Sequence, residues 1–290
     1  MDIKAIAMGL AFAVMWSSAF TSARVIVEYA PPLSALALRF LISGLLGVAI
    51  AFAIGQTARL TRRQWTGVVV FGLCQNALYL GLNFVAMQTV PASLAAIIAS
   101  TMPLLVALSG WLILGTRVRP LGIAGLVAGV IGVGLIMGAR LQGGADLYGI
   151  MLCVIGVVSL TVATMAVMGA SSGGNVLMIV GLQMLVGSAL LWVPALAFET
   201  LEVTLNWQLV VAFVYTTLVP GLAATWVWFL LVGRIGAVKA STFHFLNPFL
   251  GVAIAAALLG EAIGVLDILG VVIIAGGILA VQLSKQPTAK

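Results

Sequence analysis

The sequence predicts an all-α, polytopic membrane protein with ten transmembrane helices, arranged as two inverted five-helix repeats with cytoplasmic N- and C-termini. This prediction rests on composition, on ten long apolar stretches and on a similarity between the two halves of the chain. Of the 290 residues, 63% are hydrophobic and only 7% are charged, whereas a soluble domain carries about 25% charged residues. Together with a mean hydropathy of +1.27, this composition excludes a water-soluble protein. The net charge of +6 therefore does not indicate a nucleic-acid partner, because its meaning depends on where the charges lie relative to the bilayer.

Ten apolar stretches are long enough to cross a bilayer, which takes about 20 residues in a helix. Barrel strands would instead alternate apolar and polar residues over about ten positions. The first stretch is too long for a typical signal peptide, so we expect it to be retained. The expected spans are residues 3–22, 33–54, 65–87, 91–114, 121–138, 146–168, 175–198, 207–232, 237–259 and 264–283.

The distribution of lysine and arginine predicts the orientation. Connectors on the side of the N-terminus hold most of the basic residues: Lys4, Arg59, Arg62, Arg63, Arg117, Arg119, Arg234, Lys239, Lys285 and Lys290. The opposite side holds only Arg24 and Arg140, and Arg39 lies within the second span. Both termini are therefore expected in the cytoplasm.

A shift of the chain by 145 residues aligns parts of its two halves. Leu114-Gly115 then falls on Leu259-Gly260, and the same shift pairs Pro103 with Pro248, Gly125 with Gly270, and Gly132 with Gly277. The two predicted repeats are residues 3–138 and 146–283. Five spans in each repeat force the second copy to begin on the opposite face of the membrane. Inverted repeats of this kind are typical of carriers whose solute site lies near the membrane midplane.

Several short motifs resemble the repeat signatures of the EamA-type drug/metabolite transporter superfamily: Trp16-Ser17-Ser18-Ala19-Phe20, the run Pro31 to Phe40, Gly260-Glu261-Ala262-Ile263, and Gly270 with Gly276-Gly277. The resemblance covers both halves and implies a ten-helix carrier with internal termini, often an exporter of amino acids or other metabolites. Within the superfamily the chain is most similar to aromatic amino acid exporters of the YddG type. The first half has Gly115-Thr116 where the motif has Gly-Glu, so Glu261 lacks a counterpart and no transport role is assigned to it.

The third span carries the most conspicuous polar pattern. Gln75, Tyr79 and Asn83 follow one another at i, i+4 and i+8, which places them on one face of an α-helix. Polar groups in a bilayer need a partner or a wet cavity. This face either lines the solute pathway or bonds to neighbouring helices.

His244 and Asn247 precede Pro248 in the ninth span, and Pro103 occupies the corresponding place in the fourth. A proline in a span frees a backbone carbonyl, which is tolerated where it lines a cavity or finds a partner. One interpretation is a pair of kinked helices across the solute pathway. The alternative is an ordinary kink beside a neutral, hydrogen-bonded histidine.

Three further kinds of residue are candidates for the pathway. Trp16, Trp226 and Trp228 lie deep enough to stack on an aromatic solute, whereas Trp65, Trp192 and Trp207 fit the interfacial belt. Arg39, with Gln183 near its counterpart position, either attracts an anionic carboxylate or extends toward the outer face.

The fifth span presents a stripe of small residues that allows close helix approach, within the bundle or in a homodimer: Gly122, Gly125, Gly129 and Gly132. Gly169 to Gly173 fit G-x-S-x-G, but a nucleophile elbow follows a strand, so this stretch is expected to be a turn. No metal-binding cluster or phosphate-binding loop occurs, so neither a metal nor a cofactor is predicted.

The sequence thus predicts a non-enzymatic secondary carrier in the plasma (inner) membrane, whose partners are a small-molecule solute and the lipid bilayer. It would export neutral or zwitterionic metabolites, foremost amino acids with bulky apolar or aromatic side chains, by alternating access of the two repeats. Facilitated diffusion is expected, because every acidic residue lies near a span end and His244 is the one titratable candidate within a span. The alternatives are a multidrug or quaternary-cation exporter and, in another class, an intramembrane enzyme using Ser171 or His244.

Overall fold

The computed structural model describes residues 2–113, 115, 117–142, 144, 146–166 and 174–284. Across these residues the regular structure is helical, and the ten predicted spans are confirmed as helices long and apolar enough to cross a membrane. The expected turn containing Ser171 lies outside the described residues, as does Lys285. The spans are Ile3–Tyr29, Pro32–Ala53, Arg62–Ala86, Ala92–Leu112, Pro120–Ala139, Leu147–Ala166, Val176–Phe198, Trp207–Ile235, Ser241–Leu259 and Val265–Ser284.

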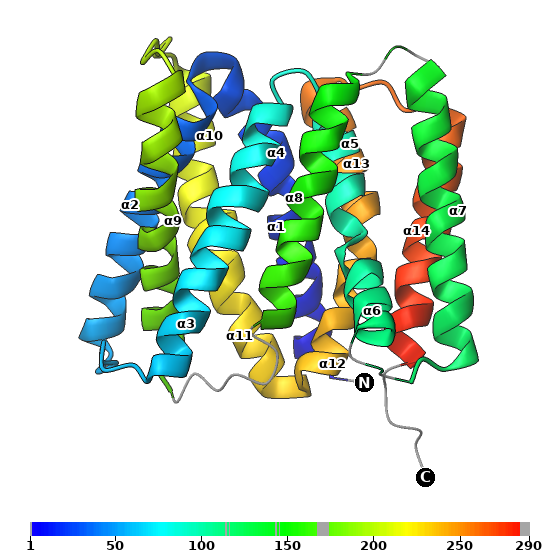
Figure 1. Cartoon of the computed structure of the whole chain (residues 1–290), viewed down its shortest axis with the longest axis horizontal. Coiled ribbons are helices and arrows are strands. Elements are labelled where there is room, and N and C mark those ends of the chain that lie inside the picture. The colour runs from blue at the N-terminus through cyan, green and yellow to red at the C-terminus, as the bar shows by residue number, and fades with distance from the viewer. Residues whose placement is uncertain are drawn as a thin grey trace. The chain divides into compact units, whose positions relative to one another are not determined.

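Six spans are single helices and four are segmented (Figure 1). The single helices are α1 (Ile3–Tyr29), α2 (Pro32–Ala53), α7 (Pro120–Gln142), α8 (Leu147–Ala166), α9 (Val176–Phe198) and α14 (Val265–Ser284). The segmented spans comprise α3 (Arg62–Phe71), η1 (Gly72–Leu80) and α4 (Gly81–Ala86); α5 (Ala92–Ser100) and α6 (Met102–Leu112); α10 (Trp207–Thr216), η2 (Thr217–Ala223) and α11 (Ala224–Ile235); and α12 (Ala237–Ala240), η3 (Ser241–Leu246) and α13 (Asn247–Leu259).

The segmented spans correspond between the two halves. The third and eighth spans each contain a π-helical segment, η1 and η2, a geometry that often occurs at functional sites. In the fourth and ninth spans, Pro103 and Pro248 stand in the first turn of α6 and α13, where the missing N–H of proline costs no helical bond. The prolines therefore begin new helical segments, whereas the sequence suggested kinks within continuous helices.

Helix α1 runs to Tyr29, so the expected end of the first span at residue 22 was wrong by about two turns. Arg24 and Glu28, which marked a connector in the sequence, form an ion pair of 3.4 Å. Arg24 also donates to the main-chain carbonyl of Met87. These partners let both charged residues remain helical.

The chain folds into two compact units. Unit 1 comprises residues 1–21, 89–150 and 223–290, and unit 2 comprises residues 22–88 and 151–222. In unit 1, α7 packs along α14 and α5 against α13 (Figure 1), and in unit 2, α2 packs along α9. Each of these contacts joins a span to the span five places later in the chain. The compact units thus combine helices from both predicted repeats.

The four glycines of the fifth span lie at the α7–α14 contact or beside it. A Cβ built on Gly125 would lie 2.6 Å from the carbonyl oxygen of Gly277, and one on Gly132 would lie 2.9 Å from that of Gly270. Gly122 faces Ser284, whereas Gly129 faces the side chain of Leu104 on α6. Larger residues at Gly125 or Gly132 would force the two backbones apart.

Two glutamates complete the N-termini of helices from the other half of the chain. In unit 2, Glu199 accepts hydrogen bonds from the backbone N–H groups of Leu33 and Ser34, at 2.7 and 2.8 Å, and from Oγ of Ser34 at 2.7 Å. In unit 1, Glu261 accepts from the N–H groups of Ala92 and Ser93, at 2.7 and 3.0 Å. A helix N-terminus has unpaired N–H groups and a partial positive charge, so a carboxylate is stabilising there. Glu261 therefore has a structural role, and Glu199 has the same capping role at α2 although it does not occupy the position that the repeat pairs with Glu261.

The start of α1 and the end of α14 lie at the same end of unit 1 (Figure 1). There the Nε of Arg234, at the end of α11, donates to Oδ2 of Asp2 at 2.5 Å. This bond holds the pKa of the Asp2 carboxyl below its usual value. Placement of this end in the cytoplasm stays a prediction from the charge distribution.

Candidate functional site

Unit 1 contains a cluster of aromatic rings from three elements, which we call the ring cluster: Phe12, Trp16, Trp228 and His244. Phe12 is buried at its centre, with ring centroids 5.6 Å from Trp16, 4.7 Å from Trp228 and 5.4 Å from His244. Phe12 meets His244 edge-on at 86°, and the Trp228 and His244 centroids are 5.2 Å apart. These separations are within the range in which aromatic pairs attract each other.

The ring cluster remains partly accessible, because Trp16, Trp228 and His244 are only half-buried. Trp226 lies two residues from Trp228 on α11 and is 64% exposed, so the structure does not bring it into the cluster. Trp207, which was assigned to the interfacial belt, is 72% exposed.

Hydrogen bonding fixes the histidine of the ring cluster. Nδ2 of Asn247 lies 3.0 Å from Nδ1 of His244, so with the amide as donor this ring nitrogen is the acceptor. Oγ of Ser17 on α1 donates to the main-chain carbonyl of Asn247 at 3.5 Å. Oδ1 of Asn247 is buried and has no partner among the described residues. His244 lies in the 3₁₀ segment η3 rather than in an α-helix, and this segment turns it toward Phe12.

Unit 2 contains the polar residues of the third span, which includes the π-helical segment Gly72–Leu80. Asn76 is buried at 2% exposure, while Gln75 is only half-buried. Nδ2 of Asn76 donates to the main-chain carbonyl of Gln183 at 2.8 Å. Asn76 is thus a buried amide that the predicted stripe did not include, and a pathway role for Gln75 stays a prediction.

Tyr79 and Asn83 lie together as expected. Nδ2 of Asn83 donates to the main-chain carbonyl of Tyr79 at 2.7 Å, and both side chains are almost fully buried. A Cβ on Gly156 of α8 would approach Nδ2 of Asn83 to 2.8 Å, so this glycine makes room for the pair. Oδ1 of Asn83 has no described partner.

Arg39 on α2 is 6% exposed, and its Nε has no hydrogen-bond partner among the described residues. Its guanidinium carbon lies 5.2 Å from the ring centroid of Phe40. The side chain is therefore enclosed by protein, and both expectations for it, attraction of a carboxylate and extension toward the outer face, stay predictions.

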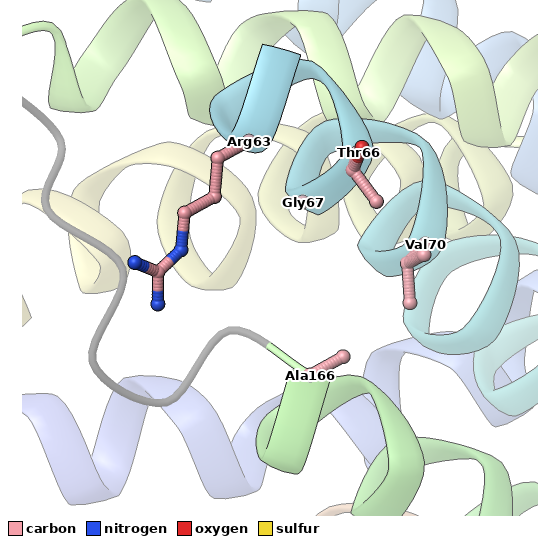
Figure 2. A pocket seen from close by; sticks show the side chains of 5 residues that line it. All are labelled: Arg63, Thr66, Gly67, Val70 and Ala166. Carbon is pink, nitrogen blue, oxygen red and sulfur yellow. The ribbon is translucent and has the colours of Figure 1, made fainter. Parts of the chain in front are cut away.

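A shallow pocket of about 180 Å³ lies between the start of α3 and the end of α8 (Figure 2). Figure 2 shows Arg63, Thr66 and Val70 on α3 and Ala166 on α8; Gly67 completes the lining. Ligand pockets usually measure about 300–1,000 Å³, so this pocket is too small to be the solute site. Among the described residues no group of three or more His, Cys, Asp or Glu could hold a metal ion.

Comparison with known proteins identifies relatives along the whole chain. YvbV of Bacillus subtilis, named an uncharacterized transporter, is 28% identical over 285 residues, which cover 97% of this chain and 92% of that protein. YedA of Escherichia coli strain K12, named an uncharacterized inner membrane transporter, is 26% identical over 280 residues, covering 94% and 88%. The aromatic amino acid exporter YddG of Ancylobacter novellus is 34% identical over 113 residues, or 39% of each chain.

One crystal structure superposes with a TM-score of 0.70 at 22% identity, covering 98% of both chains, and shows the same fold. The model of the EamA-like transporter family matches residues 3–138 and, a second time, residues 147–283. The relatives and the ten spans indicate a multi-pass protein of the plasma (inner) membrane. Because the family model matches nearly the entire chain, the protein belongs to the EamA-like transporter family.

Proposed function

We propose that the protein is a secondary carrier that exports neutral or zwitterionic amino acids with bulky apolar or aromatic side chains. The supporting observation is the ring cluster of unit 1, where three half-buried aromatic groups surround the buried ring of Phe12. Such a surface offers stacking to a planar apolar side chain, and aromatic pairs add about 0.5–1.5 kcal/mol beyond the burial of area. The partial similarity to an aromatic amino acid exporter supports the same substrate class.

The proposed transport is passive. Carriers driven by protons usually hold a titratable carboxylate within the membrane. Here all seven acidic residues lie in a connector or in a terminal turn of a span: Asp2, Glu28, Asp146, Glu199, Glu202, Glu261 and Asp267. Their placement supports facilitated diffusion, with the solute gradient setting the direction of net flux.

Alternating access must preserve the close helix pairs within each unit. Helix α7 is packed backbone to backbone on α14 through Gly125 and Gly132. In unit 2, Gly44 and Gly181 make a similar contact between α2 and α9. We therefore propose that residues 3–138 and 146–283 are the units of duplication, while the rigid bodies during transport are helix pairs that contain both halves.

A quaternary-cation exporter is the closest alternative in the same class, and the charge distribution disfavours it. Among the described residues two charged side chains are buried within spans, the cation Arg39 on α2 and the anion Asp267 in the first turn of α14. Arg39 lies farther from a helix end than Asp267 and would repel a cationic solute. No enzymatic step is proposed for His244, which is held by Asn247 and packed among rings.

Efflux from proteoliposomes tests the proposal. Vesicles loaded with radiolabelled phenylalanine, tryptophan, alanine or tetraphenylphosphonium are diluted, and release is compared with that from empty liposomes. We expect release of phenylalanine and tryptophan to exceed that of alanine, and Trp228→Ala to slow both aromatic solutes. Trp207→Ala is the matched control, because it removes an exposed tryptophan. Preferred release of tetraphenylphosphonium would establish the alternative instead.

A further inference from the structure

Arg39 is a buried cation to which the described residues supply no counter-charge. No ion pair of the described residues includes it, and its Nε has no hydrogen-bond partner there. The acidic residues of unit 2 are otherwise engaged or exposed: Glu28 pairs with Arg24, Glu199 binds the N-terminus of α2, and Glu202 lies in an exposed connector. A lone charge in a low-dielectric interior is costly unless something pairs with it. This position therefore needs an anion from outside the chain.

A second unsatisfied donor lies beside the arginine. Ser43 follows Arg39 at i+4 on α2 and is fully buried, and its Oγ has no partner among the described residues. A serine within a helix commonly bonds to the carbonyl four residues earlier. Thr216 and Thr217 bond in this way to Ala212 and Phe213. Within the described part of the chain, the hydroxyl of Ser43 does not, and it shares this unused state with the buried hydroxyls of Thr21 and Ser93.

Both donors face one point on the backbone of η2. A Cβ built on Gly221 would lie 3.4 Å from Nη2 of Arg39, 3.6 Å from Oγ of Ser43 and 3.1 Å from the main-chain oxygen of Thr216. Because Gly221 has no side chain, the two donors lie close to this point without a Cβ between them. Gly221 follows Pro220 within the π-helical segment, near the middle of the long span Trp207–Ile235.

We propose that Arg39 and Ser43, facing Gly221, form a site for the carboxylate of the transported solute. A planar guanidinium and an adjacent hydroxyl offer donors that match a carboxylate. This inference uses the proposed function only in taking the solute to carry a carboxylate. It makes Arg39 a determinant of specificity, which selects amino and carboxylic acids over amines of similar shape.

Binding to the purified full-length protein, measured by isothermal titration calorimetry, tests the site with three probes. Phenylalanine has a carboxylate and an ammonium group, phenylacetate has only the carboxylate, and phenylalaninol has only the ammonium group. We expect Arg39→Gln to weaken phenylalanine and phenylacetate at least about tenfold and to leave phenylalaninol little changed. Ser43→Ala should weaken the same two probes less. Arg59→Gln, which removes an exposed arginine, is the control and should bind all probes like the wild type.

The thermal stability of the unliganded variants separates a binding role from a structural one. Removal of an unpaired buried charge should leave the Tm of Arg39→Gln equal to that of the wild type or higher. A structural arginine would lower it, and a lowered Tm with unchanged relative affinities for the three probes would overturn the proposal.

The outcomes also separate this inference from the proposed function. Arg39-dependent binding of phenylacetate without binding of phenylalanine would retain the carboxylate site and refute amino acid transport. Binding of phenylalanine that is unaffected by Arg39→Gln would refute the carboxylate site and leave amino acid transport standing. If neither carboxylate probe binds to the wild type, both proposals fail.

Discussion

The carboxylate of Glu199 should contribute measurably to stability and little to transport. Its Oε1 accepts from the N–H of Leu33, while its Oε2 accepts from the N–H and the hydroxyl of Ser34. In Glu199→Gln one oxygen becomes an NH₂ group, so the substitution removes the charge and at least one of these bonds. Hydrogen bonds to charged groups are worth about 1.5–3 kcal/mol each, and the interaction with the helix dipole adds about 0.3–1 kcal/mol. Because Glu199 is half-buried, we expect a net loss of about 2–4 kcal/mol.

Two matched variants allow the loss of stability in Glu199→Gln to be ranked. Among the described residues Glu261 accepts two backbone bonds and none from a side chain, so Glu261→Gln should cost less stability than Glu199→Gln. Glu202 is exposed, and Glu202→Gln should resemble the wild type. Thermal unfolding of the detergent-solubilised proteins should therefore rank Tm as wild type and Glu202→Gln, then Glu261→Gln, then Glu199→Gln.

Transport measurements on the same variants show whether the two glutamates only cap helices or also couple transport to protons. Efflux per folded molecule, below the lowest Tm, should be nearly unchanged in all three. If Glu199→Gln or Glu261→Gln kept the wild-type Tm but lost transport, the carboxylate would act in the transport cycle and the capping argument would be refuted.

Three further predictions concern topology, moving bodies and coupling. Reporter fusions at Arg62 should read cytoplasmic and those at Glu202 external, because basic residues gather on the former side; the opposite signals would contradict the orientation. A disulfide between Gly122→Cys and Ser284→Cys, whose Cβ atoms would lie 3.3 Å apart, needs these atoms to separate by only a few tenths of an ångström to reach the usual range and should leave efflux intact. Loss of efflux on oxidation, restored by reduction, would show that α7 and α14 separate during transport. In proteoliposomes a pH difference alone should produce no accumulation of phenylalanine, whereas uphill uptake abolished by His244→Gln would make that histidine a proton-coupling group.

The number and the approximate ends of the spans follow from the sequence because bilayer thickness fixes the length of an apolar helix. Charged residues usually mark the connectors between spans, but they can lie within a helix where they form ion pairs or hydrogen bonds. Arg24 and Glu28 pair with each other and Arg24 also bonds to Met87, so helix α1 continues past them. Tertiary contacts of this kind have no local signature.

Only part of the candidate site was predictable, because the burial of a polar side chain also depends on contacts with other helices. Tyr79 and Asn83 are buried, and so is Asn76, which shares a helix face with them at i, i+3 and i+7. The spacing alone does not choose between Gln75 and Asn76. The close approach of α9 is visible only in the structure, where a Cβ on Gly187 would lie 2.4 Å from the Cβ of Asn76. Phe12 had a weak signal, because it precedes Trp16 by four residues. The orphan hydroxyl of Ser43 had none, because an unused donor is recognised only from its surroundings.

The pairing of each long span with the span five places later has a consequence for biogenesis. As the chain leaves the ribosome, α2 and α7 enter the bilayer well before α9 and α14, with which they pack. Until the second half of the chain is made, α14 is not there to pack on the glycine face of α7. The first N–H groups of α2 and α5 likewise lack their acceptors, Glu199 and Glu261. Neither unit can be completed from the first half alone, so tertiary folding follows insertion and remains unfinished until nearly the last span has been synthesised.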